Sequence, residues 1–93
     1  MKNGMFSKDL LPSPEYYYID QGLVLLGSGV WRSAVCPFHD DNKPSLRIST
    51  KTGGFCCMAC GEKGGDVLDF HRRKYQLSFI QAAKALGAWG VDR

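Results

Sequence analysis

Two short pairs of metal-binding residue types constrain this 93-residue chain more than any other feature. Cys36 and His39 are separated by two residues, Cys57 and Cys60 are separated in the same way, and 17 residues lie between the pairs. In a tight turn, this spacing lets both side chains of a pair reach one ion. Three thiolates and one imidazole complete a tetrahedron without an open position for water, which is typical of a structural Zn²⁺ site. We therefore expect one structural zinc ion held by these four residues.

Two further residues compete for the ligand positions. Cys56 directly precedes Cys57, and neighbours in an extended segment point to opposite faces, so only one of the two can serve. Cys57 is favoured because it gives the two-residue spacing to Cys60, whereas Cys56 gives three. His71 is an alternative imidazole, but it falls inside an expected helix without a spaced partner. We therefore expect His71 to be a surface residue.

Length and composition limit the rest of the fold. A chain of 93 residues, 44% of them hydrophobic, suits one small domain and is too short for a two-domain enzyme with its own substrate cleft. The longest apolar stretch, Leu23 to Leu26, is far shorter than the roughly 20 residues that cross a bilayer. Residues 1–11 also lack the pattern of a secretory signal. We expect a cytoplasmic protein without membrane contact, whose thiols bind metal rather than form disulfides.

Local patterns predict several short elements around the ligand pairs. Residues 1–12 lack periodicity and are expected to form a flexible lead-in to a single domain over residues 13–93. Ser13, Pro14 and Glu15 are typical of a helix start, and Ser78 with Gln81 fits a capping box. Helices are expected at about 14–21, 67–75 and 79–86. Short strands of an antiparallel sheet are expected within 23–26, 30–35, 46–49 and 55–57.

Two aromatic or apolar patterns have a structural and a functional interpretation. Tyr16 to Tyr18 cannot all face one side of a helix, so we expect one or two to pack and leave a base-stacking role open for the rest. Phe79, Ile80, Ala83 and Leu86 form one apolar stripe, which we expect to be core.

Three longer motifs resemble the CHC2-type zinc-binding domain of bacterial and phage DnaG-like DNA primases. They are Cys36-Pro-Phe-His-Asp-Asp-Asn-Lys-Pro-Ser-Leu46, Phe55-Cys-Cys-Met-Ala-Cys-Gly61 and Gly64-Gly-Asp-Val-Leu-Asp-Phe70. The resemblance covers about residues 20–87. The loop after Cys60 is one residue longer than is usual, Met58 replaces a common aromatic residue, and Cys56 stands where histidine is frequent. None of these departures removes a ligand.

The resemblance implies a small α+β fold, in which a zinc ribbon on an antiparallel sheet is flanked by short helices. It also implies a module that binds single-stranded template DNA and helps to choose where a primer starts. The family's polymerising domain is not among these 93 residues. We therefore expect no enzyme activity from this chain alone, and a primase, polymerase or helicase partner in a bacterial, phage or plasmid replication system. The alternatives are an adaptor that docks a replication protein without touching DNA, and the N-terminal piece of a full primase.

Basic residues concentrate in the cysteine-bearing part of the chain. Residues 1–30 carry a net charge of −1 and residues 31–93 carry +4. A sequence-tolerant site for single-stranded DNA needs cations along the phosphates and flat side chains for stacking. If Leu46 and Ile48 face the core, Arg47 and Ser49 face outward. The expected DNA contacts are Trp31, Arg32, Lys43, Arg47, Lys51 and Phe55, with a second cluster at Arg72, Arg73 and Lys74 that a solvated helix face explains equally well.

The adjacent carboxylates Asp40 and Asp41 resemble a catalytic pair only superficially. No nucleophile or phosphate-binding loop accompanies them in the sequence, so we expect turn groups, one of which steadies a metal ligand.

Overall fold

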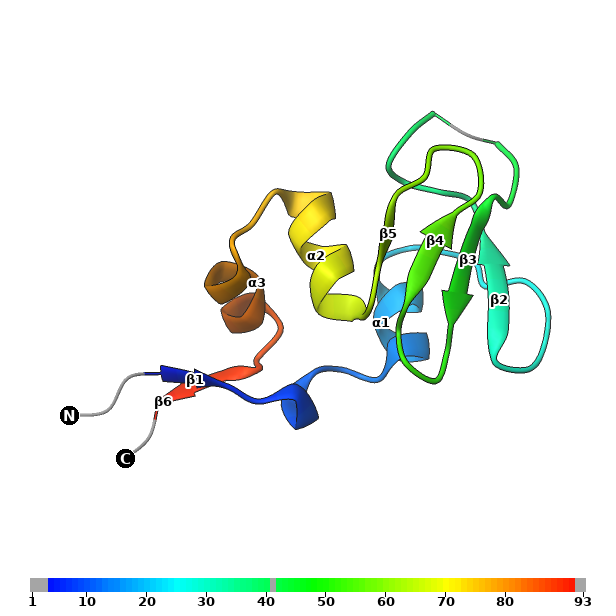
Figure 1. Ribbon diagram of the computed structural model, residues 1–93. Helices are drawn as coiled ribbons and strands as arrows, with labels where there is room; N and C mark the ends of the chain where they lie inside the picture. Colours follow the sequence, from blue (N-terminus) through cyan, green and yellow to red (C-terminus); the bar gives the residue numbers. More distant parts are fainter. Residues whose placement is uncertain (1–3, 41, 92–93) are drawn as a thin grey trace.

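The computed structural model describes residues 4–40 and 42–91, which form two antiparallel sheets and three α-helices (Figure 1). The larger sheet has four strands in chain order: β2 (Trp31–Ala34), β3 (Leu46–Ser49), β4 (Phe55–Cys57) and β5 (Lys63–Gly64). The smaller sheet pairs β1 (Gly4–Phe6) with β6 (Trp89–Val91). The helices are α1 (Pro14–Asp20), α2 (Val67–Tyr75) and α3 (Phe79–Ala85), and a 3₁₀ turn, η1, spans Lys8–Leu10. This is the small α+β fold that the sequence predicts.

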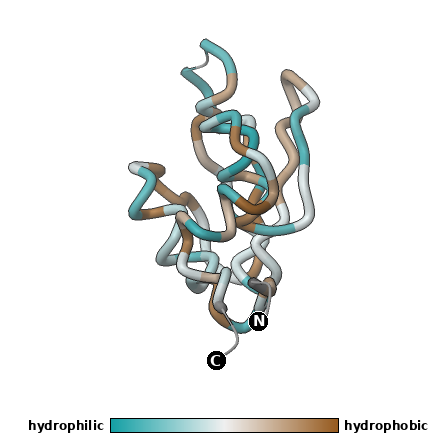
Figure 2. Tube along the Cα trace, turned by 90° about the vertical axis from the view of Figure 1, so that its left-hand side faces the viewer, coloured by the Kyte–Doolittle hydropathy of each residue, from teal (hydrophilic) through white to brown (hydrophobic). Residues whose placement is uncertain are grey.

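The molecule is elongated, with principal extents of 49 × 26 × 18 Å. The two sheets lie at opposite ends, and α2 lies between them (Figure 1). The loop between β2 and β3, at the top of Figure 2, carries Asp40, Asn42 and Lys43 and is hydrophilic. No helix in the described part of the chain is long and apolar enough to cross a membrane.

One face of the four-stranded sheet builds the main core. On β3, Leu46 and Ile48 are fully buried while Arg47 between them is exposed, as the alternation of a strand requires. Phe55 and Cys57 continue the buried face on β4. Helices α1 and α2 contribute the buried side chains that complete this core: Tyr17, Tyr18, Val67 and Phe70.

Phe70 of α2 is the centre of an aromatic cluster in this core. Its ring meets Tyr18, Phe38 and Phe55 edge to face, with centroids 4.8, 5.1 and 5.2 Å away, and Tyr17 at 5.9 Å. Edge-to-face pairs add roughly 0.5–1.5 kcal/mol each beyond the burial of their area. The cluster joins both helices to the sheet and to the loop that carries His39.

The tyrosine run divides as expected. Tyr17 and Tyr18 are buried, whereas Tyr16 has an exposed fraction of 68%. The Tyr18 hydroxyl donates to the carbonyl of Gly53 over 2.6 Å and so ties α1 to the turn between β3 and β4. Ser13 stands at the N-cap of α1, as predicted, but its side chain makes no capping hydrogen bond.

Residues 4–11 differ from the expected flexible lead-in. Phe6 pairs with Trp89 in the β1–β6 ladder, and the Ser7 amide donates to the carbonyl of Ala88 over 2.8 Å. The centroids of the Phe6 and Phe79 rings lie 5.0 Å apart. Leu11 packs against the main core and against a second buried cluster, which consists of Leu68, Ala82 and Ala83. Local sequence does not reveal this pairing because the partner strand lies at the other end of the chain.

Helix α3 buries a different face from the one that carries the predicted apolar stripe. Its capping box is present, since the Ser78 hydroxyl accepts from the Gln81 amide and the Gln81 side chain accepts from the Ser78 amide. Ala82 and Ala83 are fully buried, but Phe79 and Ile80 have exposed fractions of 38% and 45%. The prediction that Phe79 and Ile80 belong to the core is therefore wrong. Small alanines face Leu68 and bring the helix backbone close to α2.

The expected strands within residues 23–26 and 30–35 are confirmed only in part. Leu26 and Ser33 exchange two backbone hydrogen bonds of 2.7 and 3.0 Å, but this is an isolated bridge. Regular pairing begins with β2 at Trp31. Gly27 and Gly29 have φ values of +99° and +86°, which glycine adopts without strain and which turn the chain between the two segments.

The Tyr18 hydrogen bond gives a test of this packing. Tyr18→Phe leaves the buried carbonyl of Gly53 without its donor, so we expect the free energy of unfolding to fall by about 1–3 kcal/mol. Urea denaturation of the zinc-loaded protein, followed by circular dichroism, measures this change. Tyr16→Phe removes an exposed hydroxyl and is the matched control. Equal stability of the two variants would contradict the assignment.

Candidate metal centre and nucleic-acid interface

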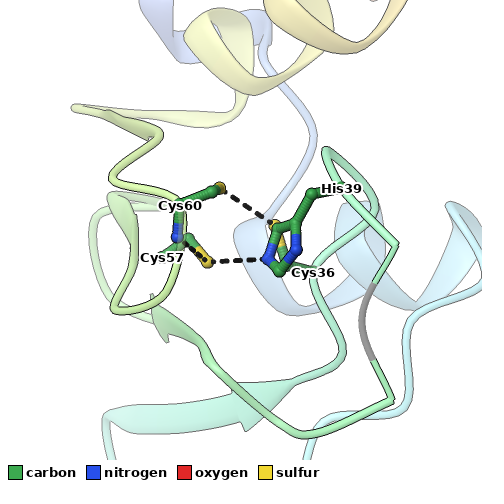
Figure 3. A group of neighbouring side chains, drawn as sticks. All are labelled: Cys36, His39, Cys57 and Cys60. Atoms are coloured by element: carbon green, nitrogen blue, oxygen red, sulfur yellow. Dashed lines mark hydrogen bonds between the residues drawn. The ribbon is translucent and has the colours of Figure 1, made fainter.

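The four predicted ligands come from two neighbouring loops at one end of the four-stranded sheet. Cys36 follows the end of β2, and His39 lies in the turn after it. Cys57 is the last residue of β4, and Cys60 lies in the turn toward β5. Their side chains point toward one another (Figure 3), and their ligand atoms all lie within 4.8 Å of one another. The sheet thus brings together the ligand set that the spacing predicts.

The spacing of the donor atoms fits one zinc ion. Cys36 Sγ lies 3.9 Å from Cys60 Sγ, and Cys57 Sγ lies 3.4 Å from His39 Nε2. A tetrahedral ion with Zn–S bonds of about 2.3 Å and a Zn–N bond of about 2.0 Å has edges of roughly 3.8 Å between sulfurs and 3.5 Å between sulfur and nitrogen. The observed contacts match these two edges, and three thiolates with one imidazole suit Zn²⁺.

Backbone amides support the two sulfur atoms that are most buried. The Phe38 amide donates to Cys36 Sγ over 3.4 Å, and the amides of Ala59 and Cys60 each donate to Cys57 Sγ over 3.4 Å. Gly61 has a φ of +83°, a conformation that glycine adopts without strain and that reverses the chain after Cys60. These donors stabilise negative charge on sulfur and orient the ligands.

The pKa values of the two buried thiols, Cys36 and Cys57, are shifted in opposite directions. Burial raises the pKa of Cys36 to about 12, and the sulfurs of Cys57 and Cys60 add to this rise. Burial alone would also raise the pKa of Cys57, but the amides of Cys60 and Ala59 and the ring of His39 outweigh it and lower the pKa to about 6. A divalent cation supplies the positive charge that lets both sulfurs ionise together.

The rival ligands lie elsewhere. Cys56 is half-buried and, next to Cys57 on β4, points to the opposite face of the sheet. His71 is half-buried and bonded through Nδ1 to the Tyr17 hydroxyl over 2.7 Å, so the prediction that it is a simple surface residue is wrong. Asp40 is exposed, and Asp41 lies outside the described residues.

The face of the four-stranded sheet opposite the core carries the exposed residues that could contact nucleic acid. We call this side the open face. Strand pairing sets Ser33 opposite Arg47, Arg47 opposite Cys56, and Cys56 opposite Lys63. Trp31 shares this face because it lies two residues from Ser33, and its exposed fraction is 54%. The accessible residues of the open face are therefore Trp31, Ser33, Arg47, Cys56 and Lys63.

Strand register overturns part of the expected contact set. Phe55 is only 3% exposed and packs in the core, so the prediction that it offers a ring for stacking is wrong. Arg32, another expected DNA contact, pairs with Ile48 on the core side and binds Glu15 of α1 at 3.5 Å, so it lies on the face opposite that of Arg47. Ser49 is on the same side of the sheet as Arg47, as expected from its pairing with Trp31, but the following turn covers it, and its hydroxyl accepts from the amides of Lys51 and Thr52.

The other expected cations are exposed at different places. Lys43 lies in the loop before β3, and Lys51 in the turn between β3 and β4. Arg72 and Arg73 are exposed on α2, where Arg72 lies 4.0 Å from Asp69 and Arg73 bonds Glu62 at 2.7 Å. Lys74 donates to the side chain of Gln21, the residue that directly follows α1, and so supports the packing of α2 against the end of α1. The structure thus does not join these cations to Arg47 in one row.

The sequence pattern does not predict that Lys63 belongs to the open face. It belongs to a two-residue strand within a glycine-rich segment, and no local periodicity marks such a short element. The pairing of β5 with β4 is the observation that places Lys63 on the open face.

Comparison with known proteins agrees with this geometry. The CHC2 zinc finger family matches residues 17–90. Gene 58 protein of Mycobacterium phage D29 is 41% identical over 54 residues, which are 58% of this chain and 41% of that protein. The DNA primase of Mycolicibacterium smegmatis is 42% identical over 52 residues, 56% of this chain and 8% of the primase. The DNA primase of Lactococcus lactis is 32% identical over 68 residues, 73% of this chain and 10% of the primase.

A solved structure extends the similarity to the fold. The zinc-binding and RNA polymerase domains of the Aquifex aeolicus primase superpose with a TM-score of 0.70 and 30% identity, over 89% of this chain and 21% of that chain. The chain belongs to the CHC2 zinc finger family, and its four ligand residues form the cluster suited to one zinc ion. It spans less than half of the phage relative and about a tenth or less of the two primases.

Metal removal tests the structural role of the site. Zinc binding contributes roughly 10–16 kcal/mol in zinc-finger peptides, which is comparable with the whole stability of a small domain. We expect a chelator, or Cys57→Ser, to abolish the cooperative melting transition in circular dichroism. Cys56→Ser is the matched control and should keep one zinc per chain by elemental analysis. A metal-free protein with an unchanged transition would contradict a structural zinc.

The half-buried position of His71 beside Lys74 predicts a dependence of stability on pH. Burial first, and then the charge of Lys74, lower the pKa of His71 below its ordinary value of 6.5. The folded protein therefore binds fewer protons than the unfolded chain just below pH 6.5. Stability from this group is present above pH 6.5 and falls as the pH drops through and below it. We expect the difference in melting temperature between the protein and His71→Gln to change across this range, and a constant difference would refute the assignment.

Proposed function

We propose that this chain binds single-stranded DNA on its open face and serves as the zinc-binding module of a DNA-priming system. The observation that carries the proposal is that an exposed indole, Trp31, and an exposed cation, Arg47, lie on the same side of the sheet. Bases of any sequence can stack on an indole, and phosphates bind a guanidinium. Membership in the CHC2 family and the similarity to bacterial primases support a role in replication.

Zinc supports this function without touching the DNA. The ligands tie the end of β2 to the end of β4, so the ion fixes the relative positions of the strands that carry Trp31 and Arg47. A fully ligated zinc has no open position for a substrate. The ion therefore supplies rigidity, and loss of zinc should remove the binding surface.

Primer synthesis itself is assigned to a partner. In the Aquifex aeolicus primase a zinc-binding domain accompanies an RNA polymerase domain. We propose that this chain presents template to such a polymerising domain, or to a helicase, either as a separate protein or within a longer chain. The site of action would be the cytoplasm, where bacterial and phage DNA is replicated.

An apolar groove favours a second candidate function. It has a volume of about 540 Å³ and lies between the segment after α1 and the first ligand pair; its lining includes Leu23, Val24, Leu26, Val35 and Pro37. Such a groove suits an apolar side chain of a replication protein. The alternative is an adaptor that docks this partner and does not touch DNA.

Charge reversal on the open face distinguishes the two functions. We expect the zinc-loaded protein to bind a fluorescein-labelled oligonucleotide with salt-sensitive affinity, measured by fluorescence anisotropy. Arg47→Glu should weaken binding by about tenfold or more, because a hydrogen bond to a charged group contributes roughly 1.5–3 kcal/mol. Lys84→Glu on α3 makes the same charge change far from the four-stranded sheet and should have little effect on DNA binding. Absence of salt-sensitive binding would favour the adaptor.

A further inference from the structure

We infer that the DNA strand crosses the open face at a steep angle to the β-strands, with its phosphates on Arg47 and Lys63 and its backbone over Cys56. This inference rests on the proposed function and adds a path and a contact residue to it. The path begins at Trp31, on the edge strand β2, and ends at β5.

Strand register sets the spacing of the two cations. Arg47 is paired with Cys56, and Cys56 is paired with Lys63, so the three residues form a row across β3, β4 and β5. Neighbouring strands lie about 4.8 Å apart, which puts the backbones of Arg47 and Lys63 roughly 10 Å apart on the same face. Both side chains are long and exposed. Two such cations can bind separate phosphates of one strand.

The charge environment separates this row from the other arginines. Arg32, Arg72 and Arg73 each lie within 4.0 Å of a carboxylate. No ion pair joins Arg47 or Lys63 to an acidic side chain among residues 4–40 and 42–91. Binding of phosphate to Arg47 and Lys63 therefore breaks no ion pair within the described structure.

Trp31 gives the path a starting point. Trp31 is paired with Ser49, two residues along β3 from Arg47, so Trp31 and Arg47 are diagonal neighbours about 7–8 Å apart. A base stacked on Trp31 would lie beside a phosphate on Arg47. The next cation along the row is Lys63.

Cys56 lies in the row between the two cations and has a small, uncharged side chain. It is half-buried, and it is the one cysteine of the four in the chain that lies outside the ligand set. In the zinc-loaded protein it is therefore the thiol that a neutral alkylating reagent reaches without competing with the metal. DNA that follows the proposed path covers this thiol.

The first experiment measures affinity and its salt dependence. Each phosphate contact to a single strand contributes about 0.7 to the slope of log K against log salt. We expect Lys63→Ala to reduce the magnitude of the slope by about 0.7, and Lys63→Glu to weaken binding about tenfold. Lys63→Arg should retain the contact, and Lys84→Glu is the charge-matched control. Zinc content and melting temperature of each variant exclude loss of the fold.

The outcomes separate this inference from the function on which it rests. If the protein does not bind the oligonucleotide at all, the proposed function fails first. If it binds, and Arg47→Glu weakens binding while Lys63→Glu behaves like Lys84→Glu, the proposed function stands and the path across β5 is wrong.

The second experiment follows alkylation of Cys56 by N-ethylmaleimide, using mass spectrometry of the zinc-loaded protein. We expect a saturating oligothymidine to slow alkylation in proportion to the fraction of protein bound. Cys56→Ser identifies the signal, since the adduct should then be absent. An unchanged alkylation rate at saturation, with binding intact, overturns the proposed path.

Discussion

Coordination of one ion by Cys36, His39, Cys57 and Cys60 is the interaction on which the rest of this structure depends. The strands of the larger sheet have two to four residues each, and such short strands stabilise little on their own. The ligands hold the ends of β2 and β4 together, while the aromatic cluster around Phe70 fixes the helices to the core face of the sheet and to the loop that carries His39. A thin core and a metal therefore share the task of stabilisation.

The sequence predicts the parts of the fold that depend on local chemistry. Ligand spacing identifies the four residues that converge, and it selects Cys57 over Cys56. The start of α3 follows from Ser78, whose side chain caps the helix as expected, and Asp66 caps α2 in the same way. These features are predictable because their partners lie within a few residues, so no tertiary information is needed.

The errors arise where a residue's environment depends on distant segments. On β4, Phe55 faces the core and Cys56 faces the opposite side of the sheet. A run of apolar residues does not show which alternate residues of a strand face the core. Arg32 is placed on the core side by its pairing with Ile48. Likewise, α3 is rotated toward its alanines because Leu68 of α2 lies against them. These three errors concern the face of an element, whereas β1, β5 and β6 are elements that the local sequence pattern does not predict.

The pairing of β1 with β6 has a consequence for the order in which the chain folds. The zinc ligands lie between residues 36 and 60, so all four are synthesised before β6. Strand β1 is made first but has no partner until β6 appears. Among the strand pairs of the described residues, this one closes the longest loop and so has the largest cost in loop-closure entropy. The ribbon therefore closes shorter loops, and we expect it to form before the β1–β6 sheet.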